Sequence, residues 1–176
     1  MSYWPPGGGA ERPAVPAGGF SAVAFHLHLD TETVDHAYPA EPFCVQPQQT
    51  AREVLQLMKE HRRGSVLICR DGVLAGIFTE RDALRMMASG SDFDVPIERV
   101  MSDDPEAVSI HETVGAAISR MSEGGFRRLP IVDQQAAPVG LLKASTILHY
   151  LVEHFPKFVY NLPPKPHHST QHREGA

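Results

Sequence analysis

The sequence has little that would mark it as secreted, membrane-embedded or bound to nucleic acid. Only two cysteines, Cys44 and Cys69, occur among 176 residues, too few for a disulfide framework, so we expect reduced, buried thiols. No apolar run approaches the roughly 18 residues that a membrane-spanning helix needs, and no charged start followed by an apolar stretch marks a secretory signal. The formal net charge is −5, whereas nucleic-acid binders usually carry a basic surplus. These absences predict a cytoplasmic protein with neither a membrane nor a nucleic acid as partner.

Motifs that would mark a catalytic or metal centre are also missing. The sequence contains no GxSxG nucleophile turn, HExxH zinc motif, Walker phosphate loop or CxxC pair. No nucleophile–base pair can be picked out either, and the clustered histidines lack the carboxylate or thiolate partners of a zinc site. We therefore expect a protein that is not an enzyme, requires no cofactor and holds no metal. The histidines concerned are His26, His28, His167, His168 and His172.

An internal repeat is the strongest feature of the sequence. Residues 42–84 align with residues 105–148 at an offset of 63 positions, which becomes 64 after one inserted residue near Pro138. A repeat of this length indicates one supersecondary unit that occurs twice. The matched pairs are Pro42 and Pro105, Val45 and Val108, Thr50 and Thr113, Met58 and Met121, Ile68 and Ile131, Gly76 and Gly140, and Leu84 and Leu148.

Each copy carries the same order of secondary-structure signals. A short extended stretch leads to a threonine N-cap, Thr50 or Thr113, and then to apolar residues spaced i, i+3, i+4 and i+7, the period of a helix. Two apolar strands joined by a turn follow, and a second helix closes the copy at 80–87 or 144–155. The predicted unit is β-α-β-β-α, an α+β fold. Neither copy has enough helix to cover both faces of its sheet, so we predict that the two pack together.

The segments outside the repeat have a different composition. Residues 1–19 contain five glycines and four prolines, and such a segment cannot bury enough surface to offset its conformational entropy. Residues 20–40 alternate in places, as a strand or a docking segment would. We predict four parts: a disordered or loosely docked segment at 1–40, folded units at 41–100 and 101–156, and a mostly flexible extension at 157–176.

These residues resemble the CBS-domain family, in the tandem form called a Bateman module and of the bacterial, stand-alone type. The likeness is carried by GSVLICRDGVLAGIFTERDALR in the first copy, by FRRLPIVDQQAAPVGLLKASTILHYL in the second, and by VMSDDPEAVSIHETV where the second copy opens. The resemblance implies two three-stranded sheets that pack face to face with pseudo-twofold symmetry. It also implies two clefts, which in many members bind AMP, ADP, ATP or S-adenosylmethionine, and association into homodimers.

The chemistry of the first copy lies in residues 76–82, GIFTERD. A strand ends before Thr79 and a helix starts after it, so the hydroxyl lies at a helix N-terminus, where free N–H groups and the helix dipole attract phosphate. Asp82 lies on the same side of the first turn, where a carboxylate can accept both hydroxyls of a ribose, and Arg81 adds a cation. The same Thr-x-x-Asp spacing is also an ordinary helix cap. The resemblance favours ligand binding, since this pattern contacts ribose and phosphate in the family.

The resemblance also implies that the second copy completes this cleft. The backbone near Ala107 and Val108 would meet the adenine, Phe126 would supply an apolar contact, and Arg127 or Arg128 would pair with phosphate. Strand alternation allows only one of these two arginines to face the cleft. The alternative without a ligand is that one of them is exposed and the other bridges to the acidic segment 102–106.

The second copy departs from the pattern at the matched positions. Lys143 replaces Thr79, and Thr146 replaces Asp82. A threonine hydroxyl cannot provide the charge-assisted, two-point acceptor that a carboxylate offers a ribose. We therefore expect one adenosyl site per chain rather than two. Lys143 is either a weak anion site or a solvated surface lysine.

Two functions remain open at this stage. The first is a non-catalytic sensor that binds an adenosine-containing ligand and signals to an unknown effector protein by conformational change. The second is a ligand-free dimerisation scaffold for a partner protein. An apolar stripe near the end of the second copy predicts a homodimer in either case, and its members are Leu148, Leu151, Val152, Phe155 and Val159.

Overall fold

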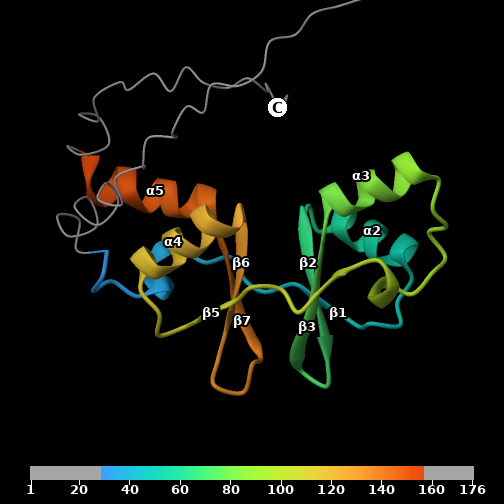
Figure 1. The fold of residues 1–176 in the computed structure, drawn as a ribbon, viewed down its shortest axis with the longest axis horizontal. Coiled ribbons are helices and arrows are strands. Elements are labelled where there is room, and N and C mark those ends of the chain that lie inside the picture. Colours follow the sequence, from blue (N-terminus) through green and yellow to red (C-terminus); the bar gives the residue numbers. More distant parts are fainter. Residues whose placement is uncertain (1–28, 157–176) are drawn as a thin grey trace, which may run out of the picture.

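The repeat forms two motifs of like build in the computed structural model, which describes residues 29–156 (Figure 1). Motif 1 consists of β1 (Cys44–Val45), α2 (Ala51–Glu60), β2 (Ser65–Arg70), β3 (Val73–Thr79) and α3 (Glu80–Ser89). Motif 2 consists of β5 (Val108–Ser109), α4 (Val114–Gly124), β6 (Arg128–Val132), β7 (Pro138–Lys143) and α5 (Ala144–His154). The predicted β-α-β-β-α unit is confirmed in both copies. The expectations for 1–28 and 157–176, including the clustered histidines and Val159, concern residues outside the described range.

Helices α2 and α4 begin at the threonines that the sequence marks as caps. In α2 the Glu53 N–H donates to Thr50 Oγ1 at 3.2 Å, and the Thr50 N–H donates to the Glu53 carboxylate at 2.8 Å, which forms a reciprocal capping box. In α4 the Ala116 N–H donates to Thr113 Oγ1 at 3.2 Å. The apolar stripe of each helix faces its own sheet, and its buried members are Ala51, Val54 and Met58 in α2, and Val114, Ala117 and Met121 in α4.

Each motif contains an antiparallel hairpin with a short parallel strand beside it. In motif 1, β1 pairs with β2 and β2 pairs with β3; in motif 2, β5, β6 and β7 repeat this order. Asp71 and Gly72 turn the first hairpin with φ of 52° and 83°, a region that glycine enters without steric cost. The two hairpin ends meet where the Leu74 N–H donates to the Ala136 carbonyl at 3.0 Å.

The chain that precedes each motif pairs with the sheet of the other motif. β4 (Ser102–Asp103) leads into motif 2 but pairs antiparallel with β3 of motif 1. At the pseudo-equivalent place, Ala40 and Leu141 of β7 exchange two backbone hydrogen bonds, at 3.0 and 2.9 Å. This exchange brings residues 102–106 beside the end of β3, where the predicted site residues lie.

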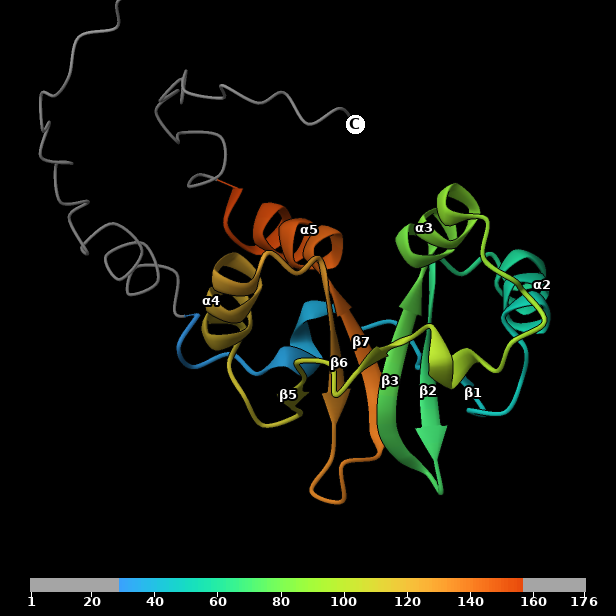
Figure 2. The same ribbon diagram turned by 45° about the vertical axis from the view of Figure 1, so that its right-hand side comes forward.

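The two sheets meet through the faces that their own helices leave uncovered (Figures 1 and 2). Leu67, Cys69 and Leu141 are buried at this junction. Larger cores lie between each sheet and its helices. Two 3₁₀ helices supply further core residues: Val34–Ala37 packs on motif 2, and Ile97–Arg99, in the linker between the motifs, buries Ile97 in motif 1. The predicted face-to-face packing of two α+β motifs is confirmed.

Candidate ligand-binding site

A cavity of about 460 Å³, here called cleft 1, lies between the motifs where β3 passes into α3. Motif 1 contributes the end of β3 and the first turns of α3. The facing wall is formed by residues 102–106, by residues 125–127, which join α4 to β6, and by Arg128 and Pro130 of β6. Six of the predicted site residues line this cavity together: Thr79, Arg81, Asp82, Phe126, Arg127 and Arg128. Its volume lies within the range of small-molecule sites, roughly 300–1,000 Å³.

Asp82 is held firmly in the wall of cleft 1. Its Oδ2 accepts two hydrogen bonds from Thr79, one from the backbone N–H at 3.0 Å and one from the hydroxyl at 2.7 Å. Its Oδ1 pairs with Arg85 Nη1 at 3.3 Å. The Asp82 side chain is only 13% exposed, whereas that of Arg85 is 71% exposed. The carboxylate is therefore fixed through one oxygen, while the other has a solvated partner.

This arrangement leaves Asp82 with capacity to bind a ligand. A carboxylate oxygen can accept about two hydrogen bonds, and an ion pair with an exposed arginine contributes at most about 1 kcal/mol. Hydroxyl groups of a ligand can therefore approach Oδ1 without breaking the helix cap at Oδ2. The cap and the binding role use different oxygens of one side chain.

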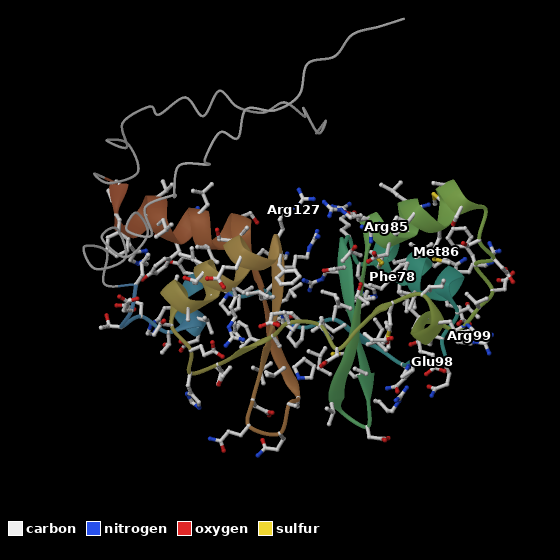
Figure 3. All side chains as sticks on the ribbon, in the orientation of Figure 1. Phe78, Arg85, Met86, Glu98, Arg99 and Arg127 are labelled. Carbon is white, nitrogen blue, oxygen red and sulfur yellow. The ribbon has the colours of Figure 1, made fainter. Side chains whose placement is uncertain are left out.

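Both Arg127 and Arg128 contribute to the lining of cleft 1, and the expectation that only one of the two side chains faces it stays a prediction. Strand alternation does not relate the two residues, because β6 begins at Arg128 and Arg127 lies in the preceding connection. Arg127 is exposed and Arg128 is half-buried. In Figure 3 Arg127 lies at the seam between the motifs, at the same end of the sheets as Arg85.

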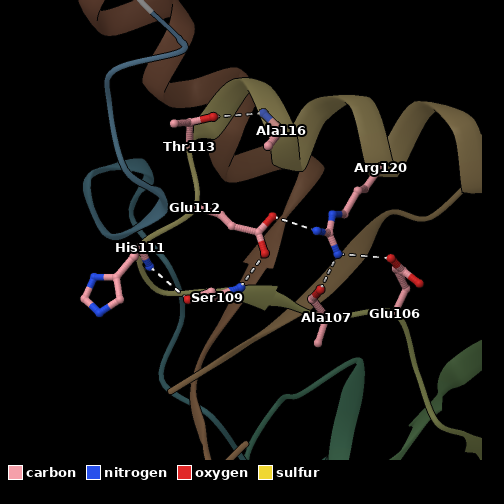
Figure 4. A network of polar contacts seen from close by, with 8 residues as sticks. All are labelled: Glu106, Ala107, Ser109, His111, Glu112, Thr113, Ala116 and Arg120. Carbon is pink, nitrogen blue, oxygen red and sulfur yellow. Dashed lines mark hydrogen bonds and ion pairs between the residues drawn. The ribbon is translucent and has the colours of Figure 1, made fainter. Parts of the chain in front are cut away.

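The wall opposite Asp82 is braced by Arg120 of α4 (Figure 4). Its guanidinium donates to the Ala107 carbonyl at 2.9 Å and pairs with the carboxylates of Glu106 at 3.1 Å and Glu112 at 2.8 Å. Neither Ala107 nor Val108 lines the cavity: the Ala107 carbonyl is engaged by Arg120, and Val108 is fully buried in the core of motif 2. On this side the cavity is lined by residues 102–106 instead of Ala107 and Val108, which were predicted to meet the adenine.

Sequence reasoning missed Arg120, although one signal was present. Arg120 is the only cationic residue of α4, and two glutamates, Glu106 and Glu112, flank β5. Opposite charges placed around a two-residue strand and on the helix that follows it favour such a bridge. Only the fold shows that the bridge also reaches the Ala107 carbonyl.

A second cavity, here called cleft 2, lies at the pseudo-equivalent place and has a volume of about 250 Å³. Lys143 lines it where Thr79 lines cleft 1, but Thr146, the counterpart of Asp82, does not. The Thr146 hydroxyl donates to the Lys143 carbonyl at 2.9 Å and accepts from the Lys143 N–H at 3.3 Å. Cleft 2 therefore lacks a carboxylate equivalent to Asp82.

The two cysteines lie on neighbouring strands but line neither cleft. Cys69 is buried, whereas Cys44 is exposed because it starts the edge strand β1, so the prediction of two buried thiols is wrong for Cys44. The Cys69 thiol donates a hydrogen bond to the Cys44 thiolate, which lowers the pKa of Cys44 to about 7. The same contact, together with burial, raises the pKa of Cys69 far above that of an ordinary thiol.

Within residues 29–156, no helix is long and apolar enough to cross a membrane. The same range contains no group of three or more histidine, cysteine, aspartate or glutamate side chains placed to hold a metal ion.

The family model of the CBS domain matches residues 37–89 and 97–153, one match on each motif. The chain belongs to the CBS-domain family. It is 41% identical over 91 residues to the CBS domain-containing protein YhcV of Bacillus subtilis, a stretch that covers 51% of this chain and 65% of that protein. The chain thus spans just under two thirds of this relative.

Solved CBS-domain pairs share the fold of the chain. The CBS domain protein PAE2072 from Pyrobaculum aerophilum, solved with AMP, gives a TM-score of 0.62 at 22% identity, over 69% of this chain and 98% of that one. The CBS-domain pair of protein MJ0100, solved with 5′-methylthioadenosine and S-adenosyl-L-methionine, gives a TM-score of 0.61 at 21% identity, over 66% and 97%. At these identities the likeness establishes the architecture alone.

Proposed function

We propose that the chain is a non-catalytic regulatory module that binds an adenosine-containing ligand in cleft 1. The ligand class comprises AMP, ADP, ATP and S-adenosylmethionine. The observation that carries the proposal is Asp82, whose Oδ2 is fixed by Thr79 while Oδ1 has only an exposed arginine as partner. A fixed carboxylate in a cavity is suited to the two adjacent hydroxyls of a ribose.

The related structures support this ligand class. PAE2072 was solved with AMP, and the MJ0100 pair with 5′-methylthioadenosine and S-adenosyl-L-methionine. These molecules share the adenosine part and differ beyond the ribose. Arg127 and Arg128 offer cations to a phosphate, while Asp103 and Asp104 on the facing wall suit a cationic group.

The proposed signal arises because cleft 1 is lined by both motifs. A ligand that contacts Asp82 of motif 1 and Phe126 or Arg127 of motif 2 favours one relative arrangement of the two. It stabilises that arrangement by an amount set by its concentration relative to its dissociation constant. An effector protein that contacts both motifs would detect this change.

We also propose that the module acts as a homodimer through α3 and α5. These helices lie at the same end of the two motifs (Figure 1). Leu84 on α3 is 64% exposed and its repeat counterpart Leu148 on α5 is 56% exposed. Two equivalent apolar positions related by a pseudo-twofold axis form a surface that matches a second copy of itself. Of the predicted stripe, Leu151 and Phe155 pack instead against the core of motif 2.

A thermal-shift series tests the proposed function. AMP, ATP and S-adenosylmethionine are each added to the full chain and to Asp82→Asn, which keeps an oxygen able to accept at the helix cap. At one hundred times the dissociation constant, a ligand adds about 2.7 kcal/mol to the free energy of unfolding. We expect a raised unfolding midpoint with at least one of the three ligands, and a much smaller shift in the variant. No shift with any of them would favour the ligand-free scaffold, an alternative that the engaged hydroxyl of Thr146 in motif 2 supports.

A further inference from the structure

Cleft 2 differs from cleft 1 in the charge of its walls. Four cationic side chains line it, those of Arg62, Arg63, Arg128 and Lys143, against the single carboxylate of Glu41. Within residues 29–156, none of these four cations forms an ion pair with a carboxylate. In cleft 1, by contrast, arginines alternate with the carboxylates of Asp82, Asp103, Asp104 and Glu106. Unpaired charge of one sign in a concave site attracts ions of the opposite sign.

A hydroxyl without a hydrogen-bond partner on the wall of cleft 2 points to the same ligand chemistry. Ser65, the first residue of β2, lines cleft 2 and is 5% exposed. It is the one buried polar residue in the described part of the chain, and its hydroxyl has no hydrogen-bond partner there. No buried side-chain nitrogen or oxygen of the described residues lacks a hydrogen-bond partner, so the Ser65 hydroxyl is open to cleft 2 and free to donate there. An anionic oxygen in cleft 2 would accept a hydrogen bond from Ser65 while the cations surround it.

Cleft 2 lacks the group that would hold the ribose of a nucleoside. The hydroxyl of Thr146 is engaged by the Lys143 backbone, and no carboxylate replaces Asp82. The volume of about 250 Å³ is little more than half that of cleft 1. We propose that cleft 2 binds a small phosphate anion, inorganic phosphate or pyrophosphate, that carries no nucleoside. This proposal does not depend on occupancy of cleft 1.

Arg128 is shared by the two clefts. A phosphate bound to it could therefore belong to a free anion or to a nucleotide in cleft 1. Arg128 lines both cavities, and its Nη2 lies 2.8 Å from the place where a Cβ on Gly64 would be, while Oε2 of Glu80 lies 2.9 Å from the same place. The missing side chain at Gly64 thus lets this guanidinium of motif 2 reach across to motif 1. A phosphate chain on a nucleotide in cleft 1 could use the same guanidinium, so the test must separate a free anion from such a chain.

Calorimetric titration of the full chain with inorganic pyrophosphate, and then with phosphate, distinguishes a free anion from the phosphate chain of a nucleotide. We expect saturable binding of one anion per chain that weakens as salt is raised. The double variant Arg63→Gln, Lys143→Gln should lower the affinity by at least about tenfold, since two charge-assisted contacts are lost. Asp82→Asn should leave pyrophosphate binding unchanged. Arg99→Gln is the matched control, because Arg99 is an exposed arginine that lines neither cleft (Figure 3).

Ser65→Ala supplies a second variant that does not alter charge. Because the Ser65 hydroxyl has no partner in the absence of an anion, the variant should unfold at an unchanged temperature yet bind pyrophosphate several-fold more weakly. The proposal is overturned by the absence of saturable binding at millimolar anion or by unchanged affinity in the double variant. It is also overturned if pyrophosphate binding is lost in Asp82→Asn, which would assign the phosphate to a ligand of cleft 1.

Discussion

The hydroxyl of Thr79 donates to Oδ2 of Asp82 at 2.7 Å, and the Thr79 N–H donates to the same oxygen at 3.0 Å. One side-chain pair thus caps α3 and fixes the orientation of the carboxylate in cleft 1. This double role explains why the Thr-x-x-Asp spacing fits both a helix cap and a ligand site. In motif 2 the same positions, Lys143 and Thr146, retain only the cap.

Thr79→Val should disturb the orientation of the Asp82 carboxylate while leaving its charge in place. Valine keeps the shape and the extended backbone preference of threonine but removes the hydroxyl donor. We expect the free energy of unfolding to fall by about 1 kcal/mol and the affinity for AMP to fall several-fold, measured by chemical denaturation and calorimetry. Thr79→Ser retains the hydroxyl and should behave like the unmodified chain. Equal AMP affinity in the valine variant would mean that Asp82 does not need Thr79 for its orientation.

Arg120→Gln should loosen the wall of cleft 1 that faces Asp82. The substitution removes the contacts of Arg120 to Glu106, Glu112 and the Ala107 carbonyl. Because Arg120 is partly exposed, we expect a loss of about 1–2 kcal/mol in the free energy of unfolding and weaker AMP binding. Arg120→Lys should restore part of both. Arg99→Gln should change neither; an equal loss in that control would show a general charge effect instead.

Cys44 should react with iodoacetamide at a lower pH than an ordinary cysteine. Only the thiolate reacts, and the hydrogen bond from Cys69 lowers the pKa of Cys44 to about 7. The alkylation rate should therefore rise with its midpoint near pH 7, whereas a free thiol has a midpoint of about 8.5. Cys69→Ala removes the donor and should move the midpoint upward. Mass spectrometry should find the first adduct on Cys44, and a first adduct on Cys69 would contradict the assignment.

A negative charge at each of Leu84 and Leu148 should abolish the proposed homodimer. Sedimentation of the full chain should give a dimer at micromolar concentration, while Leu84→Glu with Leu148→Glu should give a monomer with an unchanged circular dichroism spectrum. Val73→Glu is the control, because Val73 is an exposed apolar residue on the hairpin of motif 1, far from α3 along the strand. A monomeric unmodified chain would refute dimerisation, and a dimeric double variant would refute this interface.

Periodicity and the repeat were sufficient to predict the two motifs, because each helix and hairpin has its own apolar pattern. β4 was not predicted, because it is two residues long and is a strand only through its pairing with β3 of the other motif. Cys44 was assigned to the interior for a related reason: residue type favours burial, while its place at the start of an edge strand leaves it exposed.

The site residues that lie close together in the sequence could be predicted from the family motif. Those whose position depends on tertiary contacts were harder to predict. Thr79, Arg81 and Asp82 surround one helix start, so the sequence places them together. Ala107 was expected to meet the ligand, but its carbonyl is engaged by Arg120, thirteen residues further along the chain. The cationic walls of cleft 2 were not predicted either, because Arg62 and Arg63 belong to one motif and Arg128 and Lys143 to the other.

The most direct test of the account is the stoichiometry of AMP binding, measured by calorimetry on the unmodified chain, Asp82→Asn and Thr146→Ala. We predict one AMP per chain for the unmodified protein and for Thr146→Ala. Asp82→Asn should bind roughly ten- to a hundredfold more weakly, the loss expected for one charge-assisted acceptor. Two equal AMP sites per chain, or undiminished binding by Asp82→Asn, would contradict it.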